Sequence, residues 1–452
     1  MKDRHRITVL GAGQAAAHGE LIAAAGLVLG ARRHLDAAGV PPERALLQPF
    51  GERLPAPLRN PEGAGLGETD PAPGSRVVLG PLAPALDAVA AALAAGAGPV
   101  VVLASGDPGF FGIVRALADR FGAEALDVRP GVSSVAEAFA RLGLPWDDAV
   151  VVSAHGRDPR TALNVCRAHR KVAVLTAPGA GPAEIGAALA AVPGLRRRLL
   201  VATDLGADSE RIEEVTPEQA AERDWPGVHV VLSLGPGTGR PGPMRAVAGG
   251  TDVAEGGWGL SEDAFEHRDS MVTKAEVRAL VLARLGPRLG ELVWDVGAGS
   301  GSVAVECARL GSAVVAVEKA ADGAERVGAN AAAHGVDVAV VHGSAPEALA
   351  ELPEPDAVFV GGGGADLADI VAACAGRARR TVVVTLAALD RIPAVRSALL
   401  AAGFTAEGVQ LQTSRLAPLP GGVVRLAATN PVFVLWGTRI DSSSALSSGD
   451  TL

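Results

Sequence analysis

The chain has 452 residues, too many for one ordinary hydrophobic core, so we expect two or three domains. Hydrophobic residues make up 48% and charged residues 20% of the sequence, which excludes a disordered or fibrous protein. The net charge of −9 argues against nucleic acid as the main partner, and no apolar run approaches the ~20 residues that a membrane span requires.

The cysteines suggest a reducing compartment. The sequence has three cysteines that lie far apart, Cys166, Cys307 and Cys374. Their odd number and their spacing fit neither a zinc site nor a set of disulfide bonds. We therefore expect a cytoplasmic protein without a metal site. The polar start, Met1 to Arg6, runs directly into a strand-like segment, so we expect no signal peptide.

Residues 1–238 alternate short β-branched runs with Ala-rich amphipathic segments, which predicts mostly parallel sheets covered by helices. The segment Pro41–Ser75 is rich in Pro and Gly and is expected to be mainly loop. The predicted strands are Ile7–Leu10, Val77–Leu79, Pro99–Ala104, Ala149–Ser153, Lys171–Thr176, Leu199–Thr203 and His229–Leu234.

The first predicted strand ends in a glycine-rich turn, Gly11-Ala-Gly-Gln-Ala-Ala16. This turn satisfies the Gly-x-Gly-x-x-Ala pattern of dinucleotide-binding folds, so an NAD(P)-dependent oxidoreductase is an alternative. Such a fold also needs an acidic residue after the next strand to bind a ribose. Here the strand Leu27–Leu29 runs into Gly30-Ala-Arg-Arg33 instead, which counts against a dinucleotide.

Three later strand ends in this half carry residues suited to a small ligand. In Ser105-Gly-Asp-Pro-Gly109, Asp107 favours a turn and Gly106 allows close backbone approach, although a plain loop would use the same residues. Ser133 and Ser134 stand at a predicted helix start, where they either cap the helix or contact a ligand. Ser153-Ala-His-Gly-Arg157 adds a titratable group and a cation, although a single histidine is more often structural.

These loops resemble those of the tetrapyrrole methylase family over about residues 5–236. The resemblance implies a two-lobed α/β domain, residues 1–238, that holds S-adenosylmethionine between its lobes and methylates C5 of a corrin precursor. A common family motif, Gly-x-Gly-Pro-Gly-Asp, lacks its Asp here, which argues against an acid or base in that loop. The implied cofactor contacts are Gly11, Gly13, Gly106, Asp107, Phe110, Ser133, Ser134 and Leu205.

A Gly- and Pro-rich stretch, residues 239–262, is the predicted linker, and a second α/β pattern follows over residues 263–437. The Ser-rich residues 438–452 are expected to form a disordered tail. The predicted strands are Leu292–Val296, Ala313–Val317, Val338–Val341, Ala357–Val360, Thr381–Thr385 and Pro431–Trp436.

The strand Leu292–Val296 ends in Gly297-Ala-Gly-Ser-Gly301, whose alternating glycines let backbone amides approach a ligand. Ser302 stands where a dinucleotide fingerprint needs its third glycine, so the pattern differs from that fingerprint. The next strand ends in Glu318, which is placed to accept hydrogen bonds from both ribose hydroxyls of an adenosyl group. This combination is typical of Rossmann-like methyltransferases; the alternative is a tight turn and a surface Glu.

Two further features flank this turn in the sequence. Thr273-Lys-Ala-Glu276, before a helix predicted at Val277–Leu285, is the pattern of a capping box. In the run Phe359-Val-Gly-Gly-Gly-Gly364, four glycines follow the end of a predicted strand. The lack of side chains there either makes room for a large flat ligand or gives a flexible turn.

The segments Met271–Arg278, Trp294–Val303 and Val360–Gly363 resemble the C15-methylating, decarboxylating methyltransferases of cobalamin biosynthesis, over almost all of residues 265–436. The resemblance implies a Rossmann-like class I domain that binds a second S-adenosylmethionine. Members of that family carry an Arg after Thr-Lys, where this chain has Ala275. The residues implied to line the pocket are Thr273, Gly297, Ala298, Gly299, Ser300, Gly301, Glu318, Ser344 and Ala345.

The order of the two resemblances is itself informative, because it is similar to fused enzymes that act on precorrin-6Y. The resemblance implies that two S-adenosylmethionine molecules methylate C5 and C15, that the C12 acetate loses CO₂, and that precorrin-8 is formed. We expect a precorrin tetrapyrrole as partner, no nucleic acid, no membrane, and a homo-oligomer. No catalytic acid or base is assigned. A one-site methyltransferase with a decayed N-terminal domain is the second alternative, beside the oxidoreductase.

Overall fold

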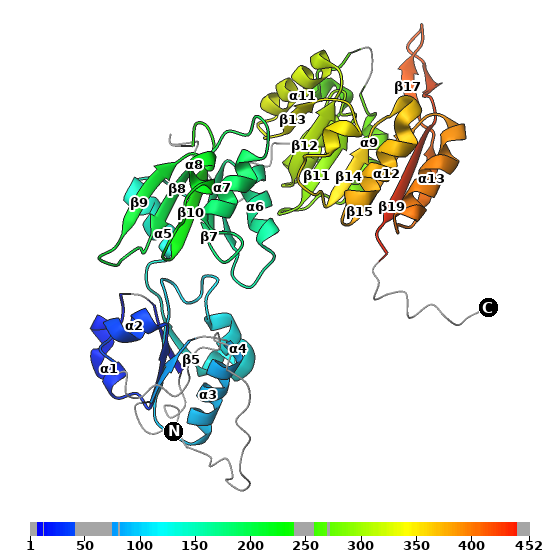
Figure 1. The fold of residues 1–452 in the computed structure, drawn as a ribbon. Coiled ribbons are helices and arrows are strands. Elements are labelled where there is room, and N and C mark those ends of the chain that lie inside the picture. Colours follow the sequence, from blue (N-terminus) through cyan, green and yellow to red (C-terminus); the bar gives the residue numbers. More distant parts are fainter. Residues whose placement is uncertain are drawn as a thin grey trace, which may run out of the picture. The chain divides into compact units, whose positions relative to one another are not determined.

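The computed structural model describes residues 7–11, 13–40, 75–79, 82–238, 257–268 and 272–440. The chain divides into two compact units, residues 1–143 and 144–452 (Figure 1). The predicted loop Pro41–Ser75 lies outside the described residues apart from Ser75, as do most of the predicted linker and the end of the predicted tail.

The first unit contains one parallel sheet with strand order β3-β2-β4-β1-β5. Its central strands are short apolar runs that are buried throughout, as expected for a parallel sheet covered on both faces. The strands are β1 (Ile7–Leu10), β2 (Leu27–Gly30), β3 (Ser75–Val78), β4 (Val100–Leu103) and β5 (Leu126–Arg129). The helices are α1 (Gly19–Ala23), α2 (Arg32–Ala37), α3 (Leu82–Ala94), α4 (Val114–Phe121) and α5 (Ser134–Leu142).

The second unit begins with a mixed sheet, ordered β6-β7-β10-β8-β9, in which only β6 and β7 are parallel neighbours. The expectation of mostly parallel sheets is wrong here, because a strand's residues do not encode the direction of its neighbour. The strands are β6 (Val150–Ser153), β7 (Lys171–Leu175), β8 (Arg198–Thr203), β9 (Arg211–Val215) and β10 (His229–Leu234). The helices are α6 (Pro159–Ala168), α7 (Pro182–Ala190) and α8 (Pro217–Ala221).

A seven-stranded sheet follows, ordered β13-β12-β11-β14-β15-β19-β16, in which β19 runs antiparallel to the other six strands. Alternate residues of β11 point to opposite faces of this sheet. Trp294 packs in an apolar cluster with helices α12 and α13, and Val293 packs in a second cluster with helices α9 and α10. The strands are β11 (Leu292–Val296), β12 (Ala313–Glu318), β13 (Ala339–His342), β14 (Ala357–Val360), β15 (Thr381–Leu386), β16 (Glu407–Leu411) and β19 (Val432–Thr438). The helices are α9 (Ala275–Leu285), α10 (Ser302–Arg309), α11 (Ala321–Ala333), α12 (Leu367–Arg377) and α13 (Ile392–Ala401).

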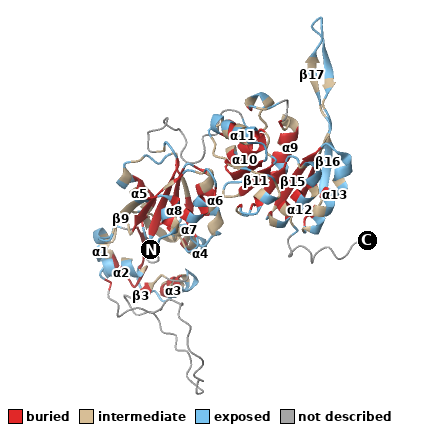
Figure 2. Cartoon of the chain, turned by 45° about the horizontal axis from the view of Figure 1, so that its top comes forward, coloured by how far each residue is buried: buried red, intermediate tan, exposed pale blue. Residues whose placement is uncertain are grey.

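The C-terminal sheet confirms the predicted Rossmann-like arrangement, and each predicted strand of that half is present. Thr438, which the sequence assigned to the tail, still belongs to β19. An unpredicted hairpin of β17 (Ser414–Pro418) and β18 (Val424–Ala428) stands apart from the sheet (Figure 2). Its apolar side chains are largely exposed, Leu416 by 73% and Leu426 by 67%.

Candidate cofactor sites

The glycine turn after β11 needs its glycines for backbone conformation. Gly297, Gly299 and Gly301 have φ values of +72°, +58° and +72°, which side-chain-bearing residues rarely adopt. A Cβ on Gly301 would also lie 2.8 Å from Cγ1 of Val327 on α11. The turn is further fixed by Asn330, whose Nδ2 donates to the carbonyl oxygen of Ser300 at 2.8 Å. Asn330 was not predicted from the sequence. The feature that could have identified it is its polar amide side chain within the Ala-rich helix α11.

Glu318, the last residue of β12, lies directly against this turn. Its side chain is almost buried, with Oε2 accepting from the Gly299 N–H at 2.8 Å and Oε1 from the Ala320 N–H at 2.9 Å. A Cβ on Gly323 would lie 2.7 Å from Glu318 Cγ, so a bare backbone position makes room for the carboxylate. The structure therefore brings together the turn and the carboxylate that the sequence paired.

A second carboxylate, Asp295, lies in the middle of β11 and was not singled out from the sequence. It is 1% exposed, and its Oδ2 accepts from the Ala304 N–H at 2.9 Å, whereas its Oδ1 has no partner within the described part of the chain. Burial, together with the negative charge of Glu318, raises the pKa of Asp295 to about 7, although the hydrogen bond from Ala304 opposes this shift. An acidic residue inside an otherwise apolar five-residue strand was the signal that could have identified it.

The raised pKa of Asp295 predicts a pH-dependent stability. Below pH ~4 the carboxyl group is neutral in both the folded and the unfolded chain, so its raised pKa does not change the free energy of unfolding. As the pH rises from 3.8 towards about 7, the group ionises more readily in the unfolded chain, and the free energy of unfolding falls until the folded chain is also ionised. Asp295→Asn should therefore stabilise the cofactor-free chain by about 1–4 kcal/mol at pH 8 and by little at pH 4. Unfolding midpoints at the two pH values measure this difference. Asp322→Asn is the control, because the pKa of Asp322 is lowered by Arg326; equal shifts at both pH values for Asp295→Asn would contradict the prediction.

The predicted capping box at Thr273 is absent. Helix α9 begins at Ala275, and its N-cap residue is Lys274 rather than Thr273, without a hydrogen bond from the N-cap side chain. The Ala275 N–H donates instead to Glu262 Oε1 at 2.8 Å, and Arg415 from the hairpin binds both Glu262 and Glu276. These hydrogen bonds from Arg415 lower the pKa of Glu262 to about 2. The ion pair between Arg415 and Glu276 thus takes the place of the predicted cap, because a charged guanidinium binds the Glu276 carboxylate more strongly than a backbone N–H would.

The segment 257–268 is tied to the C-terminal domain by a buried ion pair. Arg278 and Glu306 are 0% and 1% exposed, and their side chains lie 2.5 Å apart. Glu306 also accepts from the Gly259 and Leu260 N–H groups. Residues 257–262, the end of the linker predicted at 239–262, therefore pack against this domain.

Two other predicted loops adjoin the glycine turn. Ser344 and Ala345 follow β13, and the neighbouring Gly343 N–H donates to the Glu318 carbonyl at 3.0 Å. After β14, a Cβ on Gly361 would lie 3.0 Å from the Gly297 carbonyl oxygen, whereas one on Gly362 would meet nothing within 4 Å. The glycine run thus serves close backbone packing at Gly361 and leaves open space at Gly362.

In the first unit, three loops meet backbone to backbone at the carboxyl ends of the strands. A Cβ on Gly11 would lie 2.2 Å from both the Gly106 carbonyl oxygen and the Gly131 nitrogen. Gly106 has φ +54° and Gly13 has φ +81°, whereas Ala12 lies outside the described residues. The predicted contacts Gly11, Gly13 and Gly106 therefore lie at one edge of one sheet.

The polar residues of these loops have local roles. Asp107 Oδ1 accepts from the Gly109 N–H at 2.8 Å, which closes the predicted turn. Ser133 Oγ accepts from the Ala136 N–H at 3.1 Å, so the capping interpretation of Ser133 is confirmed, and Ser134 is the first residue of α5. The ring of Phe110 packs edge-on against Phe111 with their centroids 4.9 Å apart.

The second unit places the remaining predicted residues of the first domain. Leu205 lies in the turn between β8 and β9, where Asp204 has φ +50° and its Oδ1 accepts from the Val228 N–H at 3.0 Å. A cleft of about 450 Å³ opens at the carboxyl ends of β6 and β7. It is lined by His155, Thr176, Ala177, Pro178, Gly181, Pro182, Ala183, Glu184, Arg223, Asp224, Trp225, Gly227, Val228 and His229.

Across the described ranges, no cluster of three or more His, Cys, Asp or Glu side chains could hold a metal ion. Within the same ranges, no helix has the length and hydropathy needed to cross a membrane. The three cysteines are buried and unpaired with each other. Burial raises the pKa of the Cys166 thiol to about 12, so this group is not a nucleophile.

Two family models match the chain, one in each half. The model described as Tetrapyrrole (Corrin/Porphyrin) Methylases matches residues 17–221, and the model described as Precorrin methyltransferase domain matches residues 263–437. A probable cobalt-precorrin-6B C(15)-methyltransferase (decarboxylating) of Pyrobaculum calidifontis is 37% identical over 184 residues, which cover 39% of this chain and 94% of that protein. The chain belongs to the precorrin methyltransferase family.

A second relative matches this precorrin methyltransferase over a longer stretch. The precorrin-6Y C(5,15)-methyltransferase (decarboxylating) of Sinorhizobium sp is 38% identical over 277 residues, which cover 59% of this chain and 63% of that relative. The match thus spans less than two thirds of that relative's length. The solved C-terminal domain of precorrin-6Y C5,15-methyltransferase from Rhodobacter capsulatus is 34% identical, and the match covers 40% of this chain and 97% of that domain with a TM-score of 0.36.

These matches confirm the predicted architecture, a tetrapyrrole methylase domain followed by a Rossmann-like methyltransferase domain. They do not favour the alternative of an NAD(P)-dependent oxidoreductase. The residues that line each cofactor pocket stay a prediction.

Proposed function

We propose that the chain methylates precorrin-6Y at C5 and C15 and removes CO₂ from the C12 acetate, giving precorrin-8 in cobalamin biosynthesis. The Sinorhizobium relative is named as a decarboxylating methyltransferase for positions 5 and 15, and the Pyrobaculum relative as a decarboxylating methyltransferase for position 15. The observation that carries the proposal is the glycine turn Gly297–Gly301 held against Glu318 in one domain, with a tetrapyrrole methylase domain in the same chain.

The C-terminal site is suited to a cationic nucleoside. S-adenosylmethionine supplies an electrophilic methyl group on a positively charged sulfur. Each oxygen of Glu318 has one backbone donor, which leaves lone pairs for the two ribose hydroxyls. Asp295 and Glu318 together favour a positive charge, and a bound cation would in turn lower the pKa of Asp295. We propose that Thr273, Ser344 and Ala345 complete this pocket.

We propose a second cofactor site in the N-terminal domain, lined by the contacts that the sequence predicts there. The support is the bare backbone at Gly11, where a Cβ would clash with neighbouring loops, and at Gly106, where it would lie 3.1 Å from the Ser134 nitrogen. Neither domain needs a metal or a covalent enzyme intermediate for methyl transfer. Catalysis therefore depends mainly on holding the methyl carbon in line with a nucleophilic ring carbon. Loss of CO₂ leaves an electron pair that the conjugated macrocycle accepts once it is protonated.

Incubating the full chain with precorrin-6Y and methyl-labelled S-adenosylmethionine tests this function. We expect two labels in the product and a loss of 44 mass units, the mass of CO₂. One label without further methylation would instead support a chain whose N-terminal domain has decayed. No label in the tetrapyrrole would overturn the proposal.

We also propose that the chain is a cytoplasmic homo-oligomer whose partner is the precorrin and neither nucleic acid nor a membrane. The exposed hairpin supports self-association, because Leu416, Val424 and Leu426 are each more than 60% exposed. Among the strands that the structure describes, β17 and β18 pair only with each other.

The hairpin gives a direct test of self-association. Leu416→Ser with Leu426→Ser should lower the mass of the particle in solution to that of one 45.4 kDa chain, because apolar contact area is lost. Light scattering after size exclusion measures the mass. Leu400→Ser, at an exposed position on α13, is the matched control. A monomeric unsubstituted chain would contradict the oligomer.

A further inference from the structure

One face of helix α11 contacts both the Glu318 carboxylate and the glycine turn after β11. Gly323 lies against the Glu318 side chain, and Val327 lies against Gly301. These two residues begin a stripe with a spacing of three or four positions, which a helix brings to one face. The stripe consists of Gly323, Val327, Asn330 and His334. Its last two members contact the segment 257–268, which precedes the first helix of the domain.

Asn330 joins the glycine turn to this segment through all the hydrogen-bonding groups of its amide. Its Oδ1 accepts from the Glu266 N–H at 2.7 Å, and its Nδ2 donates to the Glu266 carbonyl at 2.9 Å and to the Ser300 carbonyl at 2.8 Å. The residue is 3% exposed, so water does not offer these groups other partners. The amide is held in one orientation, because only its oxygen can accept from an N–H and only its nitrogen can donate to two carbonyls.

The Asn330 amide thereby fixes the peptide bond between Ser300 and Gly301. Among the described residues, Asn330 is the donor to the Ser300 carbonyl. A trans peptide is planar, so the Gly301 N–H points away from that carbonyl, and it donates to the Ala298 carbonyl at 2.7 Å. This second bond closes the turn in which the Gly299 N–H reaches Glu318.

Phe265 anchors the segment 257–268 next to Glu266. Its ring is 3% exposed and packs in a cluster with Val305 of α10 and Ala331 of α11. The Arg278 guanidinium lies 4.7 Å from the ring centroid, and the His334 ring centroid lies 5.0 Å from it. Phe265 therefore holds the backbone of the segment where Glu266 can pair with Asn330.

We propose that Asn330 is a positioning residue of the C-terminal cofactor site, through which S-adenosylmethionine affinity depends on the docking of the segment 257–268. The inference rests on the proposed function. Asn330 acts through Ser300: its amide holds the closed form of the glycine turn, and the segment holds the amide. Undocking the segment leaves the amide without Glu266 and the turn free to open, so cofactor binding then has to close the turn as well.

Substitutions of Asn330 test the donor role, by calorimetric titration of the full chain with S-adenosylmethionine. Asn330→Ala should weaken binding at the proposed C-terminal site about tenfold, because the buried Ser300 carbonyl loses its donor. Asn330→Asp keeps the shape and the acceptor but turns a carboxylate oxygen towards two carbonyls, and it should weaken binding at pH 8 at least as much. Unchanged affinity in Asn330→Asp would overturn the inference.

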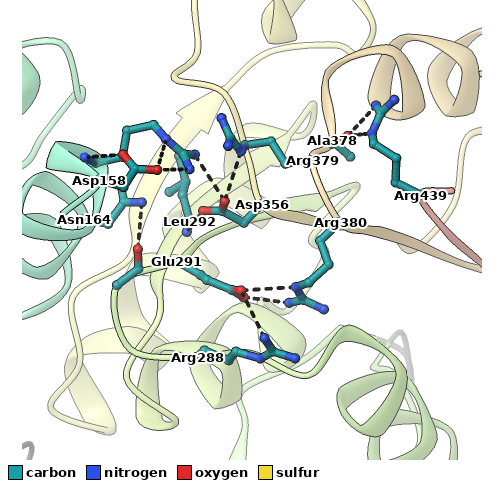
Figure 3. Close-up of polar contacts among 12 residues, drawn as sticks. Asp158, Asn164, Arg288, Glu291, Leu292, Asp356, Ala378, Arg379, Arg380 and Arg439 are labelled. Atoms are coloured by element: carbon teal, nitrogen blue, oxygen red, sulfur yellow. Dashed lines mark hydrogen bonds and ion pairs between the residues drawn. The ribbon is translucent and has the colours of Figure 1, made fainter. Parts of the chain in front are cut away.

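A second buried asparagine provides the matched control. Asn164 on α6 is also 3% exposed, and its amide donates to the Gly290 carbonyl at 3.1 Å (Figure 3). Asn164→Ala should lower the unfolding temperature but bind S-adenosylmethionine like the unsubstituted chain. A loss of affinity equal to that of Asn330→Ala would show that any lost buried amide has this effect, and would contradict a positioning role.

A double substitution tests the coupling to the segment. Phe265→Ala should weaken binding at the same site, and adding it to Asn330→Ala should cause little further loss, because both act through the same hydrogen bonds. Phe404→Ala, at a fully buried ring in the other apolar cluster, should leave the affinity unchanged. Losses of affinity that multiply in the double variant would show that Phe265 and Asn330 act independently, against the inference.

Amide hydrogen exchange of residues 297–301 follows the turn without any cofactor. Exchange should be faster in Asn330→Ala and in Phe265→Ala than in the unsubstituted chain, because the turn opens more often. Faster exchange in a chain that does not bind S-adenosylmethionine would reject the proposed function and keep the link between segment and turn. Unchanged exchange in both variants would reject that link.

Discussion

Replacing Glu318 with Ala should weaken S-adenosylmethionine binding about 100-fold at the proposed C-terminal site and leave the proposed N-terminal site unchanged. In the proposed site this carboxylate accepts from the two ribose hydroxyls, beside its backbone donors Gly299 and Ala320. Hydrogen bonds to a charged group contribute about 1.5–3 kcal/mol each, and we expect ~3 kcal/mol of binding free energy to be lost in total. Calorimetric titration of the full chain, which counts sites and affinities together, measures the effect.

Two variants control for indirect effects of this substitution. Glu318→Gln keeps one acceptor oxygen and should give an intermediate affinity. Glu325→Ala, at an exposed position on the adjoining helix α11, should bind like the unsubstituted chain. Two sites of unchanged affinity in Glu318→Ala would remove the ribose role from this residue.

The second large effect is expected at the buried ion pair. Arg278→Ala should lower the free energy of unfolding by about 3–5 kcal/mol, because Glu306 would keep a buried charge without its partner. Arg278 also donates to the Thr273 and Leu260 carbonyl groups, so the substitution loosens the segment before α9 as well. Denaturant unfolding of the C-terminal transition measures the loss.

An exposed pair provides the matched control. Arg198 and Glu214 lie 3.1 Å apart with side chains 40% and 56% exposed, and Arg198→Ala should cost about 0–1 kcal/mol. If Arg278→Ala costs no more than Arg198→Ala, the pair does not stabilise the fold as we describe.

Features that depend on neighbouring residues could be predicted from the sequence. The glycine turn at Gly297–Gly301 was identified because positive φ values are a local property that glycine alone accommodates at little cost. The strands β11 and β12 of the C-terminal sheet were identified because fully buried strands are short continuous apolar runs. Glu318 was identified from its position one strand later.

Features that depend on distant partners were missed. β16 is largely exposed and β9 is partly exposed, and both carry few apolar residues, so their sequences resemble loops. The capping box at Thr273 failed because Arg415, 139 residues after Glu276, binds that carboxylate. The direction of β8, β9 and β10 was wrong because alternation of strands and helices does not specify how strands pair.

The sequence by itself determined the two α/β halves, the glycine turn with its acidic partner and the family resemblance, because each is encoded within one strand–turn–helix stretch. Only the tertiary structure decided that Asp295 is a buried carboxylate with a raised pKa, that residues 257–262 belong to the C-terminal domain, and that Arg197 meets Asp337 across 140 residues of sequence. These features arise from burial and charge pairing between segments far apart in the chain, and no local pattern of residue types records which segments will meet.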